Sequence, residues 1–121
     1  FEVSRATYTH QAELEIFGRD GVKLGDYWKD GMRTYQGFMA HGFPNCYVMS
    51  NPQAGFTANY PHLLDEQATH IAWIVRAGRD RGATVIEVTP EAEAAWVQQC
   101  IDRARNLNDF FESCTPGYYN N

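Results

Sequence analysis

The feature that most constrains the fold is a short apolar run, residues 46–49, bounded on both sides by turn-forming residues. Pro44 and Asn45 precede the run, and Asn51 and Pro52 follow it. An apolar run of this length between such breakers predicts a buried β-strand. A glycine-containing loop and a long amphipathic pattern come next, so we expect a strand–loop–helix unit. In α/β proteins, ligands bind outside the carboxyl ends of strands and against helix N-termini.

Amphipathic periodicity predicts a helix directly after this loop, over residues 61–77. Asn59 stands where a helix cap is needed, Pro61 suits the first turn and Gly78 lies near the end. Trp73 falls on the polar side, so its indole is either exposed or covered by another part of the protein. At roughly 100° per residue, the apolar face of this helix holds Leu63, Leu64, Gln67, Ala68, Ile71, Ile74 and Val75.

A second helix is expected after Thr89, whose side chain can cap the first turn, with Pro90 in the first position. It is expected to run to about Asn106. Its apolar face holds Trp96, Val97, Cys100, Ile101, Ala104 and Leu107. The two helices are therefore each expected to bury one face against other parts of the protein.

Short strands are expected at residues 83–88 and, as a hairpin, at residues 14–17 and 22–24. Together with the helices they predict an α/β fold made of two amphipathic helices plus short strands and hairpins. Because these strands are too few and too short to form a sheet of their own, we expect a fragment of a larger protein. The chain also begins with Phe1 rather than Met, as expected for a piece of a longer polypeptide.

The composition bounds the partners of the chain. Its 121 residues suffice for one small domain, and its formal net charge of −5 argues against binding to nucleic acid or to an anionic membrane surface. No apolar run approaches the roughly 20 residues that span a bilayer. The spacing of Cys46, Cys100 and Cys114 fits no zinc site, so reduced thiols in a cytoplasmic protein are expected.

A stripe of polar residues on the first expected helix resembles a metal site only superficially. His62, Glu66 and His70 are spaced four residues apart, so the two histidines lie about 12 Å from each other along the helix axis. One metal ion cannot bind both, and a solvated polar face is the better interpretation. The sequence also holds no phosphate-binding loop, dinucleotide fingerprint or nucleophile elbow, so no metal ligand and no catalytic residue is assigned.

The loop over residues 50–60 is the remaining candidate for binding. Asn51 and Gln53 offer amides, Gly55 permits close backbone approach and Phe56 offers a stacking face. Free N–H groups at the start of the following helix can donate to an anionic or carbonyl edge of a ligand. Plain scaffolding is the competing interpretation, because position in a fold does not by itself make a site.

Six short segments, taken in order, carry a resemblance to a known family. They are Phe1-Glu2, Ile16-Phe17-Gly18-Arg19-Asp20-Gly21, Tyr27-Trp28-Lys29-Asp30-Gly31 with Thr34-Tyr35-Gln36-Gly37, Gly42-Phe43-Pro44-Asn45, Asn51-Pro52-Gln53, and Thr89-Pro90-Glu91-Ala92-Glu93 with Trp96. In this order they resemble the C-terminal portion of flavin-dependent Baeyer–Villiger monooxygenases. The resemblance covers nearly the whole chain.

The resemblance implies a parent enzyme with two dinucleotide-binding domains, one for FAD and one for NADPH. Such an enzyme inserts an oxygen atom next to a ketone carbonyl and gives an ester or lactone. Residues 1–121 would form the C-terminal part of the FAD-binding domain and the helical segment after it. The FAD and NADPH fingerprints and the catalytic arginine of the family are absent from these residues, so the isolated chain is expected to be inactive. Its partner would be the missing N-terminal part of the same polypeptide.

The same resemblance implies that the cofactor contacts lie in the loop after the expected strand. The residues concerned are Asn51, Pro52, Gln53, Phe56, Thr57, Asn59 and Tyr60. The backbone around Asn59 and Tyr60 would face the pyrimidine edge of the flavin. Residues 51–57 would border the flavin, the nicotinamide or the substrate.

Two positions depart from the family pattern. Asn51 stands where the family has glycine before the proline, and Ser113 is followed by Cys114 where many members carry tryptophan in a loop that folds over NADP. Such loops vary with substrate size, which is consistent with a bulky ketone such as a steroid. Two alternatives stay open: a non-catalytic interaction or dimerisation module derived from such an enzyme, and a related flavin-dependent hydroxylase of amines or sulfides.

Overall fold

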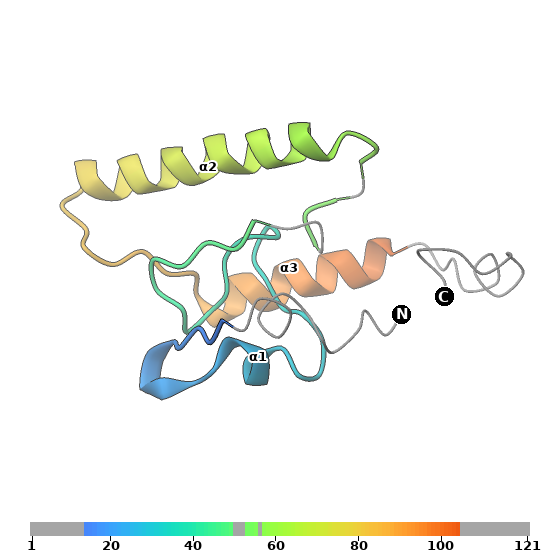
Figure 1. Cartoon of the computed structure of the whole chain (residues 1–121), viewed down its shortest axis with the longest axis horizontal. Coiled ribbons are helices and arrows are strands. Elements are labelled where there is room, and N and C mark those ends of the chain that lie inside the picture. The colour runs from blue at the N-terminus through green and yellow to red at the C-terminus, as the bar shows by residue number, and fades with distance from the viewer. Residues whose placement is uncertain (1–13, 50–52, 56, 105–121) are drawn as a thin grey trace, which may run out of the picture.

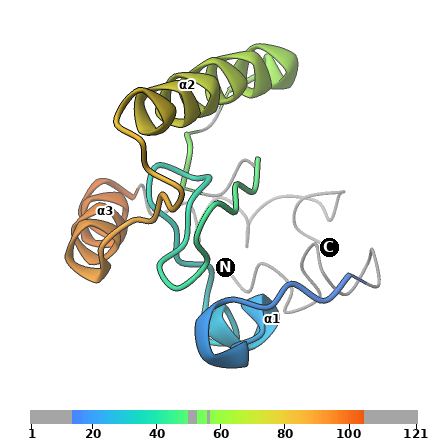
Figure 2. The same cartoon turned by 90° about the vertical axis from the view of Figure 1, so that its left-hand side faces the viewer.

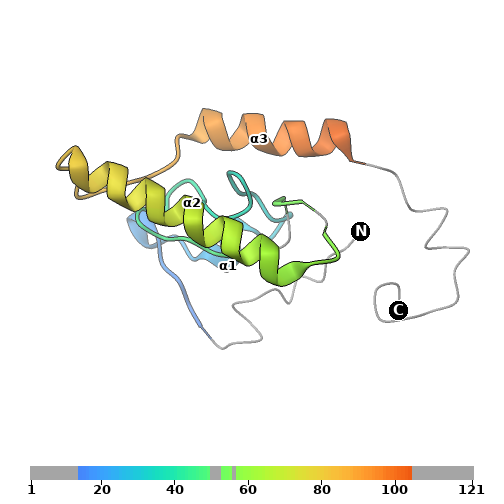
Figure 3. The same cartoon turned by 90° about the horizontal axis from the view of Figure 1, so that it is seen from above.

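A computed structural model describes residues 14–49, 53–55 and 57–104. Within them the elements are a 3₁₀ turn at Arg19–Gly21, α1 (Leu24–Tyr27), α2 (Tyr60–Asp80) and α3 (Pro90–Arg103). The two long helices run in opposite directions, with the irregular segment between α1 and α2 lying between them (Figure 1). Seen from the side, α2, α3 and α1 surround this segment (Figure 2), and the view from above shows α2 and α3 again as separate rods (Figure 3).

The helix expected after the loop is confirmed and is slightly longer than the sequence pattern predicts. The α2 helix begins at Tyr60 and ends at Asp80, rather than spanning 61–77. Asn59 is its cap, and its Oδ1 accepts a hydrogen bond from His62 N at 3.2 Å. Pro61 occupies the first turn, where its missing N–H costs nothing.

Most of the expected apolar face of α2 is at least partly covered within the described residues, and one edge stays open. Ile71 and Ile74 pack against a buried cluster formed by Phe38, Met39 and Val88. Gln67 is also buried, whereas Val75 is 39% exposed and Ala68 is exposed. Trp73, for which exposure or an external cover was expected, is 63% exposed. The exposed edge at Trp73 and Val75 is a surface that another part of a protein can bury.

The second helix is also confirmed, and Trp96, Val97 and Cys100 of its expected apolar face are half-buried. Thr89 Oγ1 accepts from Ala92 N at 3.2 Å, as the cap prediction requires, and α3 ends at Arg103 rather than near Asn106. Ile101 was assigned to the apolar face but is 61% exposed. The most deeply buried side chain of the helix is instead Glu93, at 1% exposure.

The expected strands do not form among the described residues. The hairpin is reduced to a single bridge between Phe17 and Lys23 around the 3₁₀ turn, and α1 begins directly afterwards. Residues 46–49 and 83–88 are irregular, and Val48 N donates to Phe38 O at 2.8 Å instead of joining a ladder. A strand exists only when a neighbouring strand pairs with it, and apolar patterning alone does not supply that neighbour.

The segment Gly42-Phe43-Pro44-Asn45 is a turn that joins two distant parts of the chain. Asn45 N donates to Ile86 O, its Oδ1 accepts from Ile86 N, and its Nδ2 donates to Thr84 O, at 2.9, 2.9 and 3.0 Å. Asn45 therefore makes, by itself, hydrogen bonds to the segment 84–86 that a paired strand would otherwise make. Its backbone is left-handed, with φ of 56°, a conformation that asparagine tolerates better than most residues.

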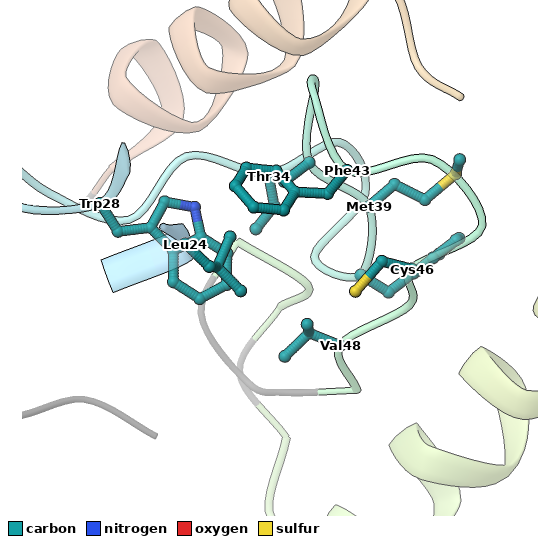
Figure 4. A pocket seen from close by; sticks show the side chains of 9 residues that line it. Leu24, Trp28, Thr34, Met39, Phe43, Cys46 and Val48 are labelled. Atoms are coloured by element: carbon teal, nitrogen blue, oxygen red, sulfur yellow. The ribbon is translucent and has the colours of Figure 1, made fainter. Parts of the chain in front are cut away.

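Phe43 projects from this turn into the main core. It is 3% exposed, packs in a cluster with Leu24, Trp28 and Ala40, and its ring lies 5.6 Å from that of Tyr27. Figure 4 shows the neighbouring side chains converging on this interior: Leu24, Trp28, Thr34, Met39, Cys46 and Val48. The space between them is too small for a water molecule, as in a close-packed core.

The cysteines within the described residues are reduced thiols. Cys46 and Cys100 are both free and both half-buried, and burial raises the pKa of each thiol. Cys114 lies outside the described residues. A raised thiol pKa keeps the sulfur protonated and unreactive, so these two cysteines serve in packing. In the described part of the chain, no helix is both long and apolar enough to cross a bilayer.

The hydrogen bonds of Asn45 lead to a stability prediction. Replacing Asn45→Ala removes two side-chain hydrogen bonds, at about 1 kcal/mol each, and leaves a side chain in a left-handed backbone, at about 1 kcal/mol more. Asn45→Gly removes the same bonds without the backbone strain. We expect urea unfolding to show that the alanine variant is the less stable of the two, and equal or reversed stabilities would contradict this account of the turn.

Candidate functional site

A buried carboxylate on α3 ties the irregular segment to the helix. Glu93 Oε2 accepts from the Tyr27 hydroxyl at 2.5 Å, and Oε1 accepts from His41 N at 2.8 Å. The guanidinium of Arg33 lies 3.6 Å from Oε2 and supplies the compensating charge. A carboxylate that is 1% exposed must be paired in this way, because an unpaired buried charge is costly.

The Tyr27 hydroxyl is held in its protonated form beside Glu93. Burial first, and then the hydrogen bond to Glu93, raise the pKa of Tyr27 to about 12. The hydroxyl therefore stays protonated and continues to donate to the carboxylate. Tyr27 also holds the ring of Phe43, so one side chain connects α1, α3 and the main core.

A second carboxylate, on Glu87, fixes the glycine that precedes Phe43. Its Oε2 accepts from Nε and Nη2 of Arg19 at 2.9 and 2.7 Å, and its Oε1 accepts from Gly42 N at 2.9 Å. The hydrogen bond from Arg19 and the one from Gly42 lower the pKa of Glu87. Gly42 adopts φ of 86°. Its carbonyl oxygen lies so close to Gly18 that a Cβ on Gly18 would be 2.3 Å from that oxygen.

Of the predicted cofactor residues, Asn51, Pro52 and Phe56 lie outside the described residues, and Gln53 has its side chain turned inward. Gln53 Oε1 accepts from Thr34 N at 2.7 Å and from Thr34 Oγ1 at 2.6 Å, and its Nε2 donates to Met32 O at 2.7 Å. Its main-chain carbonyl accepts from Trp96 Nε1 at 3.0 Å. The loop is thus anchored to two parts of the fold at this residue.

Thr57, Asn59 and Tyr60 form the entry to α2. Thr57 Oγ1 accepts from Asn59 N at 3.1 Å, while the Asn59 side chain caps His62 N. At the first turn of α2, Pro61 has no N–H and His62 N–H is capped by Asn59. Tyr60 N–H has no partner among the described residues. Tyr60 itself is 40% exposed. The structure thus brings these three predicted residues together around one helix start.

An open groove of about 520 Å³ adjoins this loop. Leu63, His70 and Trp73 of α2 line one wall, Trp96 of α3 lines the other and Ala54 lies between them. His70 packs edge-on against Phe38, with ring centres 5.2 Å apart, so it serves as an aromatic neighbour. No cluster of three or more His, Cys, Asp or Glu side chains able to hold a metal ion occurs in the described part of the chain.

Sequence reasoning missed several residues that hold the site together. Glu87 was not singled out, and Glu93 was noted only within the segment 89–93 that resembles the family, because acidic residues beside and within the first turn of a helix are usually solvent-exposed. Thr34, 1% exposed, was also not assigned a role. The tryptophan of α3 was noted as an apolar residue, but its donor Nε1 was not expected to reach the loop. The hydrogen bonds of these residues join positions far apart in the sequence, so only the folded structure reveals them.

The described residues fit one end of FAD. The flavin ring has a pyrimidine edge rich in carbonyl groups, for which a free backbone N–H at a helix start is a suitable donor. Tyr60 N–H and the positive end of α2 meet this requirement. The diphosphate of FAD needs a glycine-rich cradle, and the sequence contains none. The groups at the start of α2 therefore suit the ring end of FAD rather than its diphosphate.

Comparison with other proteins shows which proteins this chain is similar to. No family model matches the sequence. The chain is 42% identical over 114 residues to a neopentalenolactone D synthase of Streptomyces avermitilis, covering 94% of the chain and 19% of the relative. It is 42% identical to a Baeyer–Villiger monooxygenase of Streptomyces coelicolor, covering 92% and 18%, and 35% identical to an FAD-binding monooxygenase of Emericella nidulans, covering 98% and 18%.

Solved structures give the same result. A polycyclic ketone monooxygenase from Thermothelomyces thermophila matches with a TM-score of 0.84 and 30% identity, over 98% of this chain and 19% of that one. A cyclohexanone monooxygenase from Rhodococcus sp. Phi1, bound to NADP+, matches with a TM-score of 0.72 and 34% identity, over 77% and 17%.

These matches identify the class first: the chain is homologous to a segment of flavoprotein monooxygenases. Within that class its relatives are Baeyer–Villiger monooxygenases, as the order of the six sequence segments indicated. The chain spans about a fifth of the length of the curated relatives it matches.

The lowered pKa of Glu87 predicts an acid-sensitive fold. The ordinary value is 4.5, and Arg19 and Gly42 hold the folded value below it. The stabilisation is therefore complete above about pH 4.5 and is lost as the pH falls through the folded pKa. Glu87→Gln is expected to reduce this loss, measured as the change in urea unfolding free energy between neutral and acidic pH.

Glu66→Gln is the matched control, because Glu66 is exposed on α2 and forms no ion pair with the described residues. It should keep the acid sensitivity of the unchanged protein. If both variants lose stability on acidification to the same extent, the ion pair of Glu87 does not stabilise this fold.

Proposed function

We propose that this chain is the C-terminal portion of an FAD- and NADPH-dependent Baeyer–Villiger monooxygenase. The whole enzyme oxidises a ketone to an ester or lactone, with a bulky ketone as the substrate class. Residues 1–121 complete its FAD-binding domain and add the helical segment that follows. The observation that carries this proposal is the match of 98% of the chain to a polycyclic ketone monooxygenase at a TM-score of 0.84.

Within such an enzyme, the loop before α2 serves the cofactor. Tyr60 N–H donates to the pyrimidine edge of the flavin, and Asn59 holds the first turn in place by capping His62. Asn51, Pro52, Phe56, Thr57 and the main chain at Gln53 complete the border of the flavin, nicotinamide and substrate. FAD, when bound, transfers electrons from NADPH to oxygen, and this chain positions the ring from one side.

The remaining part of the same polypeptide is the proposed partner. It supplies the FAD and NADPH fingerprints, and it covers the open edge of α2 where Trp73 and Val75 are exposed. The free thiols of Cys46 and Cys100 suit a reducing compartment, and we therefore place the enzyme in the cytoplasm.

The first experiment compares two proteins: the full-length polypeptide that contains this chain, and residues 1–121 alone. With NADPH, oxygen and a polycyclic ketone, mass spectrometry of the full-length reaction should detect a product heavier than the ketone by one oxygen atom. Residues 1–121 alone should give no product. Oxygenation by the isolated chain, or a full-length protein without FAD, would overturn the proposal. The latter result would favour a non-catalytic interaction module.

The position of Asn59 gives a sharper prediction. Asn59→Asp keeps a good cap for His62, so folding stability should change little, but it adds a negative charge at the start of α2. The reduced form of the flavin gathers negative charge at its pyrimidine edge, which a nearby carboxylate destabilises. We expect the flavin reduction potential of the full-length enzyme to fall by tens of millivolts in spectroelectrochemical titration.

Asn59→Ser is the matched control, because serine caps the helix without a charge. It should leave the potential close to that of the unchanged enzyme. Equal potentials in the aspartate and serine variants would mean that the start of α2 does not face the flavin.

A further inference from the structure

Gln53 has an unusual backbone for a residue with a long side chain. Its φ is 60°, in the left-handed region that is strained for residues other than glycine. Such a conformation persists only where the surroundings hold it, and it is typical of functional sites. Within the described part of the chain, the three hydrogen bonds of its amide to Met32 and Thr34 supply this hold on one side.

Helix α3 also fixes the backbone of Gln53. Trp96 Nε1 donates to the main-chain carbonyl of Gln53 at 3.0 Å, and the indole packs edge-on against Tyr35 with ring centres 6.1 Å apart. The next residue, Ala54, sits against Gly37, where a Cβ would lie 2.4 Å from the Ala54 Cβ. The main chain at 53–54 is thus fixed by a side-chain amide, an indole and a close backbone contact.

We propose that Gln53 and Trp96 are positioning residues that set the path of the flavin-facing loop. The amide of Gln53 is engaged with Met32 and Thr34, so it acts through the loop and not by touching the cofactor. Trp96 couples the placement of the loop to α3. This inference rests on the proposed function, because it takes FAD as the ligand of the loop.

The test is FAD affinity in the full-length polypeptide, measured by titrating the apoprotein with FAD and following flavin fluorescence. Trp96→Phe retains an aromatic ring for Tyr35 but removes the donor to Gln53. We expect its FAD Kd to rise about fivefold, which corresponds to the loss of one hydrogen bond. Gln53→Met retains the side-chain length but removes all three amide bonds, and it should weaken FAD binding at least as much.

Thr89→Ala is the matched control on the same helix. It removes the α3 cap and so lowers stability, while the side-chain bond it deletes lies within α3 and not at the loop. Its FAD affinity should stay within twofold of the unchanged protein, which separates positioning from general destabilisation.

Three outcomes would overturn one claim or both. Unchanged FAD affinity in both the Trp96 and Gln53 variants overturns the positioning role, and so does an equal loss in Thr89→Ala. Failure of the unchanged polypeptide to bind FAD overturns the proposed function as well. If Trp96→Phe does not fold, Gln53→Met alone decides the matter by the same criterion.

Discussion

The buried carboxylate of Glu93 is the interaction on which the described structure depends. It is 1% exposed, and it accepts hydrogen bonds from Tyr27 of α1 and from the backbone of His41, with Arg33 nearby as the positive partner. Without regular sheet, the irregular segment between α1 and α2 has few backbone ladders of its own. Polar side chains take over that role, and Glu93 ties α1 and two positions of the segment, Arg33 and His41, to α3. Removing one member of such a buried set leaves the others unpaired, which is costly.

Other polar side chains fix the irregular segment in the same way as Glu93. Glu87 fixes Gly42, Asn45 replaces a strand pair, and Gln53 anchors the loop that enters α2. Each of these side chains satisfies backbone groups that secondary structure would otherwise satisfy. The result is a scaffold in which a loop with little regular structure is held in a defined place. That is the property a cofactor-facing loop needs.

The long helices could be predicted from the sequence. The strand at residues 46–49 and the orientation of the Gln53 side chain could not, for a common reason. The long helices follow from local signals, namely periodicity, Asn59, Thr89 and the prolines after them, because helical hydrogen bonds close within one segment. The strand expected at residues 46–49 was wrong within the described residues, since strand pairing depends on a partner elsewhere. The inward amide of Gln53 could not be foreseen either, because no local pattern distinguishes an amide that faces a ligand from one that faces the backbone. The family resemblance succeeded because it used the order of several motifs at once.

The central claim is that the start of α2 contacts the flavin ring, and amide hydrogen exchange tests it most directly. Exchange at single-residue resolution would be measured on the full-length polypeptide with and without FAD. If the start of α2 contacts the ring, Tyr60 N–H should exchange markedly more slowly with FAD bound than in the apoprotein. Protection that appears elsewhere in the polypeptide while Tyr60 exchanges at an unchanged rate would contradict the account.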